Sequence, residues 1–453
     1  MKKGRTLFRC GSCGHEEPKW LGRCPECGEW NTLVEGPVSL GNGPLGRTGP
    51  AGRNEAGSGA VPRSMPLSAV DPQEGKRIGS GITELDRVLG GGIMKRSAVL
   101  LGGEPGIGKS TLLLQTAAAA QTKGRVLYIS GEESAGQVRM RADRLGLNSG
   151  LERIEICCTG ALEEILPILE AVKPVLIMAD SAQTLHTSEA GPAPGTVNQM
   201  KFCAYELISW VKERDASLFL AAHVTKDGLI SGPKTLEHMV DTVLYFEQGG
   251  GYDSGDGAGE CRFLRAVKNR FGSVDEMGIF TMGEKGLAVV EDPSLLFLVR
   301  REGAVPAGIA TAAVLEGSRS LLVEIQALTV PAKGSISRVF SGSIEANRVS
   351  RTAAALEKHL GLRLSDQDLY INVAGGIRIK EVGVELALAA ALYSARTGLA
   401  LPVDRAIAGE LSLAGEVLPA RRQGVREKTA QGLGFSLFTA QDLRGAIKGL
   451  FGK

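Results

Sequence analysis

The chain has 453 residues, 43% of them hydrophobic, which at roughly 150 residues per domain is enough for two or three domains. Its formal net charge is only +2, which excludes a global positive field, so any binding of nucleic acid must come from local patches or loops. The first residues lead into no apolar signal segment and no run of about 18 apolar residues occurs, so we expect a cytoplasmic protein without membrane contact.

Two Cys-x-x-Cys knuckles lie in residues 1–34, a segment too small for a hydrophobic core of its own. The four cysteines are Cys10, Cys13, Cys24 and Cys27. Their spacing is typical of a zinc ribbon, in which each knuckle turns two thiolates toward a tetrahedral Zn²⁺. Such a closed site leaves no open coordination position, so the metal would fold the module and not catalyse. A redox dithiol is the competing interpretation, but redox motifs usually come singly.

The sequence leaves open what this ribbon binds. Trp20, Arg23 and Trp30 are suited to stacking on nucleic acid or docking a protein, and the tryptophans would equally well fill the small core. The cysteines outside the ribbon have apolar neighbours, so we expect them to be buried packing residues. They are Cys157, Cys158, Cys203 and Cys261.

Residues 35–77 are rich in Gly, Pro and Ser, which predicts a flexible linker. In residues 78–290, apolar runs then alternate with helical stretches, which predicts a doubly wound α/β domain. The runs that indicate buried parallel strands are 126–130, 175–179 and 218–222. At the start of the domain, residues 83–86 resemble a capping box for a short helix that the glycines at 90–92 would end.

The most specific motif of this domain is a phosphate-loop pattern, G-x-x-x-x-G-K-[ST]. It is formed by Gly103, Glu104, Pro105, Gly106, Ile107, Gly108, Lys109, Ser110 and Thr111. Its glycines let backbone N–H groups surround phosphates, while Lys109 neutralises the β and γ charges and the Ser110 hydroxyl can ligate Mg²⁺. A plain glycine-rich turn is the alternative, but the full spacing is a much narrower pattern. We therefore expect a nucleoside triphosphate site.

Carboxylates follow two of the apolar runs. Asp180 ends one of them and is predicted to hold Mg²⁺ together with Ser110, although it could instead cap the next helix, as Ser181 could. Glu132 and Glu133 follow another run, and one of them is expected to polarise the attacking water. We favour Glu132, because a solvated helix start accounts for its neighbour.

Further candidates follow the strand at 218–222. His223 is placed to sense the γ-phosphate, and a satisfied packing histidine is equally consistent with the pattern. Two Gly/Pro-rich segments, 189–200 and 226–234, leave the same predicted sheet edge and are expected to be loops. Long loops beside a nucleotide site commonly carry function.

The string Lys268-Asn269-Arg270-Phe271-Gly272 closes a later strand and places the two cations on one face. Lys268 and Arg270 would either reach the γ-phosphate of a neighbouring subunit or hold a phosphate of nucleic acid. A solvated basic edge that blunts sheet pairing is the third interpretation.

The four-cysteine ribbon, the phosphate loop and the Lys-Asn-Arg-Phe-Gly string, in this order, resemble the bacterial RadA (Sms) family of DNA repair proteins. The resemblance covers nearly the whole chain except the linker. It implies a RecA-like, DNA-dependent ATPase that uses ATP, Mg²⁺ and Zn²⁺, forms a hexameric ring, and drives branch migration of recombination intermediates. It also implies single-stranded and branched DNA and the RecA recombinase as partners. Glu132 would be the water-activating base, and the loops carrying Lys226 and Lys234 would hold DNA.

Residues 293–453 resemble the proteolytic domain of the Lon protease family, notably at 379–385 and 409–411. Val384 stands where that family has its nucleophilic serine, and the position of the lysine partner falls on Gly424 or Arg426. Proteolysis needs a nucleophile and a base, so we expect an inactive domain that serves as an assembly platform and offers a basic DNA-binding surface. The basic residues are Lys333, Arg338, Arg348 and Arg351.

The predicted fold class is therefore α/β, with a RecA-like P-loop core, an N-terminal zinc ribbon and a C-terminal Lon-protease-like α+β domain. A signalling ATPase of the KaiC type, which autophosphorylates and binds proteins, is the alternative function. The zinc ribbon and the single ATPase copy argue against it.

Overall fold

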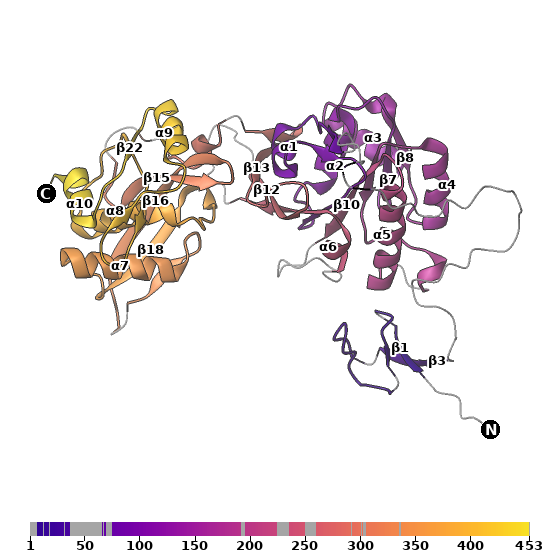
Figure 1. Ribbon diagram of the computed structural model, residues 1–453, viewed down its shortest axis with the longest axis horizontal. Coiled ribbons are helices and arrows are strands. Elements are labelled where there is room, and N and C mark those ends of the chain that lie inside the picture. The colour runs from indigo at the N-terminus through magenta and orange to yellow at the C-terminus, as the bar shows by residue number, and fades with distance from the viewer. Residues whose placement is uncertain are drawn as a thin grey trace, which may run out of the picture.

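The computed structural model describes residues 7–36 except 12, 18 and 31, then 66, 68, 75–191, 195–223, 235–249, 260–290, 292–299, 301, 305–334 and 337–452. These residues form a small N-terminal ribbon, a nine-stranded central domain and a six-stranded C-terminal domain (Figure 1). Most of the predicted linker lies outside the described residues, and so do the predicted DNA contacts Lys226 and Lys234.

Three short antiparallel strands make the ribbon, in the order β2-β1-β3. They are β1 (Leu7–Cys10), β2 (Glu16–Glu17) and β3 (Leu33–Gly36). Among the described residues, the buried apolar side chains of this unit are Cys10, Cys24 and Leu33. So small a core cannot hold a fold without a cross-link, which is the physical reason for the cysteine cluster.

The central domain is built on one sheet in the order β14-β13-β12-β11-β6-β10-β9-β7-β8. The six strands from β11 to β8 are parallel, and β12, β13 and β14 continue the sheet antiparallel. The strands are β6 (Ala98–Gly103), β7 (Val126–Ser130), β8 (Ile154–Cys157), β9 (Leu176–Asp180), β10 (Ser217–His223), β11 (Thr242–Gln248), β12 (Glu260–Asn269), β13 (Met277–Gly283) and β14 (Gly286–Val289). A separate pair, β4 (Arg77–Ile78) and β5 (Ile93–Met94), flanks the first helix.

Helices cover both faces of this sheet, which is why its central strands are buried and apolar for most of their length. The helices are α1 (Thr83–Leu89), α2 (Lys109–Ala119), α3 (Ala135–Arg144), α4 (Leu162–Val172), α5 (Val197–Lys212) and α6 (Thr235–Met239). Helices α1 to α3 share one core with the sheet, and α4 to α6 share the core on its other side. The doubly wound α/β domain predicted from the sequence is confirmed.

Three local expectations were wrong. The helix at residue 83 starts without a side-chain cap, so residues 83–86 are no capping box, although Gly90 does end the helix in the left-handed conformation. The loop expected at 189–200 is shorter, because Ser188–Ala190 form a 3-10 turn and Thr196 caps α5. Cys158 is exposed, whereas the other three non-ribbon cysteines are buried as predicted.

None of the described helices combines the length and apolarity needed to cross a bilayer.

The C-terminal domain is a six-stranded mixed sheet in the order β17-β18-β16-β15-β19-β22. Its strands are β15 (Ile309–Glu316), β16 (Arg319–Pro331), β17 (Val339–Ser341), β18 (Gln367–Val373), β19 (Arg405–Ile407) and β22 (Ser436–Phe438), with a side pair β20 (Glu410–Leu411) and β21 (Val417–Leu418). Its helices are α7 (Ala346–Leu360), α8 (Glu385–Thr397), α9 (Gln423–Gly432) and α10 (Leu443–Phe451). Helices α7, α8 and α10 pack on one face of the sheet, and α9 packs on part of the other.

The two large domains share a core. Phe263 of β12 and Met277 and Ile279 of β13 belong to the same buried cluster as the C-terminal strands β15, β16 and β18. Phe297, which follows the 3-10 turn Pro293–Leu296, lies in this cluster with its ring centroid 6.1 Å from that of Phe263. The outer strands of the central sheet therefore serve both domains.

Candidate nucleotide site, zinc site and C-terminal pseudo-site

Four parallel strands end at one edge of the central sheet. Gly103 pairs in register with His223, and Ser130 pairs with Asp180. Because the carboxyl ends of parallel strands meet at the same edge, residues predicted from four separate segments come together here.

The phosphate loop connects β6 to α2 at this edge. Gly106 and Gly108 have φ angles of 79° and 114°, which favour glycine. A Cβ on Gly108 would lie 2.6 Å from Cε of Met282, and one on Gly103 would lie 2.9 Å from the carbonyl oxygen of Phe246. Three of the glycines thus allow a tight loop whose N–H groups lead into the N-terminus of α2, as a phosphate site requires.

Lys109 is buried at the start of α2 and points back into the loop. Its Nζ donates to the carbonyl oxygens of Gly103 at 2.8 Å and Glu104 at 2.9 Å, and lies 3.2 Å from Nδ1 of His223. Burial lowers the pKa of Lys109 to about 8, against the opposing charges of Asp180 and Glu132. The ammonium is thus largely desolvated and held where phosphate charge would be compensated.

Glu132 faces the phosphate loop. Its Oε1 accepts a hydrogen bond from Oγ of Ser181 at 2.9 Å and lies 3.6 Å from Nε2 of His223. A lysine ammonium can only donate, so Nδ1 of His223 accepts from Lys109. Nε2 on the other side of the ring faces Glu132 at a distance longer than a hydrogen bond. The lysine, the histidine and the glutamate thus lie in one row, with His223 between the other two.

Glu133, the alternative base, is engaged elsewhere. Its carboxylate forms a close ion pair with Arg141 of α3, and its carbonyl accepts from Oγ of Ser130 at 2.8 Å. The geometry therefore favours Glu132 for a role at the phosphates.

Asp180 is held by a residue that the sequence reasoning missed. The hydroxyl of Tyr128, which is buried in β7, donates to Oδ2 of Asp180 at 3.0 Å. Burial and the charge of Asp180 raise the pKa of Tyr128, so the phenol keeps its proton. A tyrosine inside an apolar strand needs a partner for its hydroxyl, and that was the available signal.

The two cations at the end of β12, Lys268 within the strand and Arg270 just after it, lie beside α6 and not beside the phosphate loop of their own chain. Nζ of Lys268 donates to three backbone carbonyls, those of Glu237 at 2.8 Å, His238 at 3.3 Å and Val240 at 2.6 Å. Burial, together with the charge of Arg270, lowers the pKa of Lys268. Arg270 has a 61% exposed side chain and lies 3.5 Å from Asp241. Neither cation contacts Lys109 or Glu132, so any role at a nucleotide would concern another subunit.

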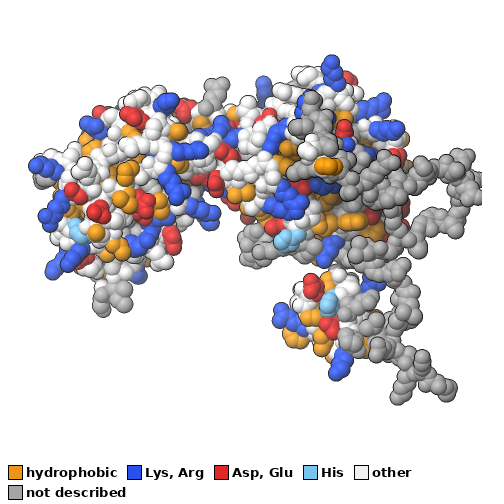
Figure 2. Space-filling view, viewed as in Figure 1, with side chains coloured by type: hydrophobic (Ala, Val, Ile, Leu, Met, Phe, Trp, Pro, Cys, Tyr) orange, Lys and Arg blue, Asp and Glu red, His pale blue; other side chains and the backbone are white. Residues whose placement is uncertain are grey.

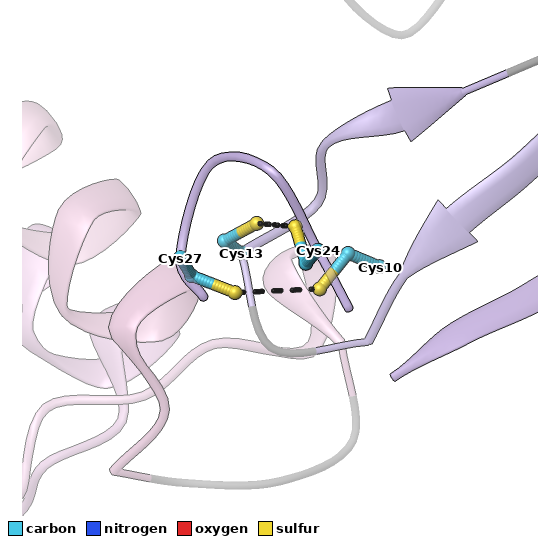
Figure 3. Close-up of side chains that lie close together, drawn as sticks. All are labelled: Cys10, Cys13, Cys24 and Cys27. Atoms are coloured by element: carbon cyan, nitrogen blue, oxygen red, sulfur yellow. Dashed lines mark hydrogen bonds between the residues drawn. The ribbon is translucent and has the colours of Figure 1, made fainter. Parts of the chain in front are cut away.

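The four ribbon cysteines converge on one point (Figure 3). Their sulfur atoms all lie within 4.8 Å of one another, with 3.7 Å between Cys10 and Cys27 and 3.5 Å between Cys13 and Cys24. Burial raises the pKa of Cys13 and Cys27, so thiolates at this point require a compensating cation. A set of four clustered sulfur donors fits tetrahedral Zn²⁺.

The aromatic residues of the ribbon are on its surface. Trp20 and Trp30 are 54% and 70% exposed, so neither serves mainly as core. Nε1 of Trp20 donates to the carbonyl of Leu33, and the guanidinium of Arg23 lies 5.9 Å from the ring centroid of Trp30. This leaves stacking on nucleic acid and protein docking as the two functional interpretations.

In the C-terminal domain, a buried ion pair occupies the neighbourhood of Val384. Arg426 pairs closely with Glu381, and its guanidinium lies beside Gly383, where a Cβ would be 3.1 Å from Nη2. Gly424 has no such neighbour, since a Cβ there would meet nothing within 4 Å. The structure thus places Arg426, and not Gly424, beside the segment of Val384.

The basic stretch expected in this domain is not a continuous cationic surface. Arg348 is buried and donates to the carbonyls of Glu381 and Lys380, Arg338 pairs with Asp368, and Arg351 lies 3.6 Å from Glu385. On the face in Figure 2, Lys and Arg are interspersed with Asp and Glu. Counting charges along the sequence missed these partners.

A phosphate loop with acidic residues at neighbouring strand ends, joined to a four-cysteine ribbon, defines a P-loop ATPase with a RecA-like core and a zinc ribbon. Family comparisons agree with this class. Residues 78–155 match the KaiC ATPase family, and residues 8–35 match the family described as the rubredoxin metal binding domain.

Whole-chain comparisons identify the family. The chain is 55% identical to the DNA repair protein RadA of Treponema pallidum over 435 residues, which cover 96% of this chain and 91% of that protein. It is 43% identical to the DNA repair protein RadA of Bacillus subtilis over 455 residues, covering 99% and 95%. The chain belongs to the RadA family of DNA repair proteins. A match over this length does not favour the KaiC-type signalling alternative.

Proposed function

We propose that this chain is a DNA-dependent ATPase that drives branch migration of recombination intermediates during recombinational repair in the cytoplasm. The observation that carries the proposal is the row of Lys109, His223 and Glu132 beside Asp180 at one sheet edge. A carboxylate held next to a phosphate-binding lysine is the arrangement needed to activate water against a γ-phosphate.

In this mechanism the phosphates of ATP are bound by the Lys109 ammonium and by backbone N–H groups of the phosphate loop at residues 106–111. Glu132 orients the attacking water and accepts its proton, and Ser181 holds that carboxylate in place. Ser110 and Asp180 would hold Mg²⁺, which supplies charge compensation for the phosphates, and Tyr128 fixes the direction of Asp180. His223 is near enough to respond when phosphate draws Lys109 away from it.

The coupling to DNA is proposed to act between subunits of a hexameric ring. Family membership supports single-stranded and branched DNA as ligands and the RecA recombinase as a partner. Lys268 and Arg270 lie away from the phosphate loop of their own chain, which supports a role at a neighbour's ATP or at a DNA phosphate. Lys226 and Lys234 remain predicted DNA contacts.

The C-terminal domain is proposed not to cleave peptides. The position of the nucleophile is the buried Val384, and Arg426 beside it is engaged by Glu381. A permanently charged, ion-paired arginine cannot act as the general base that a serine nucleophile would need.

ATP turnover by the full chain, with and without single-stranded DNA, tests the proposal. Lys109→Ala should abolish turnover, and Glu132→Gln should lower it by about 10²–10⁴-fold while ATP still binds. Glu133→Gln is the matched control and should retain turnover within severalfold. DNA-independent turnover by a chain that never moves a branched DNA junction would overturn the proposal. Phosphate covalently bound to the protein after incubation with ATP would instead favour the signalling alternative.

A further inference from the structure

The phosphate loop rests on the hairpin of β13 and β14. These strands pair antiparallel, with Met282 opposite Leu287 and Gly283 opposite Gly286. A Cβ on Gly108 would lie 2.6 Å from Cε of Met282 and 3.8 Å from Cδ1 of Leu287. The side chains of Met282 and Leu287 therefore form a floor under the loop, and the glycine at position 108 lets the backbone come this close to it.

One side chain of α2 holds this hairpin in place. Nε2 of Gln115 donates to the carbonyl of Leu287 at 3.0 Å, and Oε1 of the same amide accepts from the N–H of Leu287 at 3.1 Å. Among the described strands, β14 is at the edge of the nine-stranded sheet. The amide of Gln115 thus takes the place that a further strand would have on the outer side of β14.

The tip of the hairpin fits closely between α2 and the end of α3. Gly286 has a φ angle of 90°, and a Cβ there would lie 2.5 Å from Cδ2 of Leu145, 3.1 Å from Cγ2 of Thr111 and 3.2 Å from Oε1 of Gln115. Leu145 follows α3, and Thr111 is the last residue of the phosphate-loop motif. The tip therefore lies against both ends of the motif, at Gly108 and at Thr111.

The base of the hairpin is built into a different core. Met277 and Ile279 of β13 are buried in the cluster shared with the C-terminal domain. The carbonyl of Met277 accepts from Arg319 at 3.1 Å, and the N–H of Ile279 donates to Glu84 at 2.8 Å. The hairpin is thus fixed at its base by the boundary between the domains and at its tip by Gln115.

We infer that Gln115 is a positioning residue of the nucleotide site, which clamps the β13–β14 hairpin to α2 so that Met282 supports the phosphate loop at Gly108. Both polar atoms of the Gln115 amide are engaged by Leu287, so the residue acts on the loop through the hairpin and not by contact with phosphate. Without the clamp, ATP would have to order the loop as it binds, which weakens binding. This consequence for ATP rests on the proposed function, whereas the clamp itself does not.

Hydrogen exchange on the full chain, without ATP or DNA, tests the clamp. Gln115→Met keeps an unbranched side chain of similar helix propensity and removes both hydrogen bonds, so exchange in residues 283–289 should become about five- to tenfold faster. Gln121→Met is the matched control, because Gln121 is an exposed glutamine just after α2, and it should leave the hairpin unchanged. Equal exchange of the hairpin in Gln115→Met and the wild-type chain would overturn the inference.

Steady-state ATP turnover by the same variants separates positioning from loss of folded protein. Gln115→Met should raise the KM for ATP roughly five- to tenfold and change kcat by less than about twofold, because the supported loop binds ATP and the transition state alike. A variant that is merely unfolded in part would show a lower kcat and an unchanged KM, and that result would overturn the inference.

A second pair of variants tests the floor. Met282→Ala removes the support under Gly108 while the Gln115 bonds to Leu287 remain, so it should raise the KM for ATP as well. Met282→Leu refills the volume and should restore the KM. An unchanged KM for Met282→Ala would contradict the role given to the hairpin. Absence of ATP turnover in the wild-type chain would refute the proposed function, and the exchange experiment would still decide the clamp because it needs no ligand.

Discussion

Replacing Arg426 by methionine should destabilise the C-terminal domain by about 3–5 kcal/mol, because removing one partner of a buried ion pair leaves the other charge uncompensated. Arg426 is 0% exposed and its partner Glu381 is 18% exposed. The guanidinium also donates to the carbonyls of Ala313 and Arg421, which would lose a donor. Methionine retains most of the side-chain volume, so the effect reports lost charge and hydrogen bonding and not a cavity.

Urea unfolding followed by pulse proteolysis, with peptides from residues 337–452 read by mass spectrometry, isolates this domain from the rest of the chain. With an ordinary dependence on urea for a domain of this size, the midpoint should fall by roughly 2 M. Arg421→Met is the matched control, since Arg421 is exposed on the same segment and its backbone carbonyl is retained. It should change stability by no more than about 0.5 kcal/mol.

A second substitution separates charge from packing. Combining Arg426→Met with Glu381→Gln removes the uncompensated charge and keeps an acceptor for the N–H of Leu315, which donates to Glu381 at 2.7 Å. The double variant should therefore recover part of the lost stability. An unchanged midpoint for Arg426→Met would refute the reasoning, and so would a double variant less stable than the single one.

Two other predictions concern helix α4 and the N-terminal ribbon. Glu163 accepts hydrogen bonds from the N–H of Ser188 and from the hydroxyls of Ser188 and Thr187. These bonds lower the pKa of Glu163 to about 2. The ionised carboxylate therefore stabilises the folded chain above the ordinary pKa near 4.5, and this stabilisation is lost as pH falls toward 2. The difference in melting temperature between the wild-type chain and Glu163→Gln should therefore be present at pH 6 and shrink between pH 4.5 and pH 2; a difference independent of pH would contradict this. For the ribbon, Cys24→Ser should remove bound zinc and unfold residues 7–36 while leaving DNA-free ATP turnover intact, as measured by metal analysis and tryptophan fluorescence. Retention of a full equivalent of zinc would contradict the four-cysteine assignment.

The sequence predicted features that depend on local pattern and strand direction. The phosphate loop, Asp180 and His223 could be assigned to one sheet edge because parallel strands end together. The sequence could not reveal contacts between side chains that lie far apart in the chain. Glu84 fitted a local capping pattern, but its carboxylate is taken by Arg319, and Arg348 counted as surface charge although it is buried. Strand alternation placed Lys268 and Arg270 on one face, but it could not show that Lys268 donates to carbonyls at the end of α6 while the side chain of Arg270 is mostly exposed.

Contacts between distant segments also give the C-terminal domain a structural role beside the ATPase sheet. Its core includes Phe263 and Ile279 from the outer strands of the ATPase sheet, so removing the domain would expose a face of that sheet. Beside Val384, the Arg426–Glu381 pair joins α9 to β15, whose hairpin with β16 holds Glu84 through Arg319. Close-packed interiors transmit small displacements because they cannot absorb them. The Arg426–Glu381 pair thus connects α9 to the hairpin that contacts the ATPase domain, and such a structural link needs no catalysis.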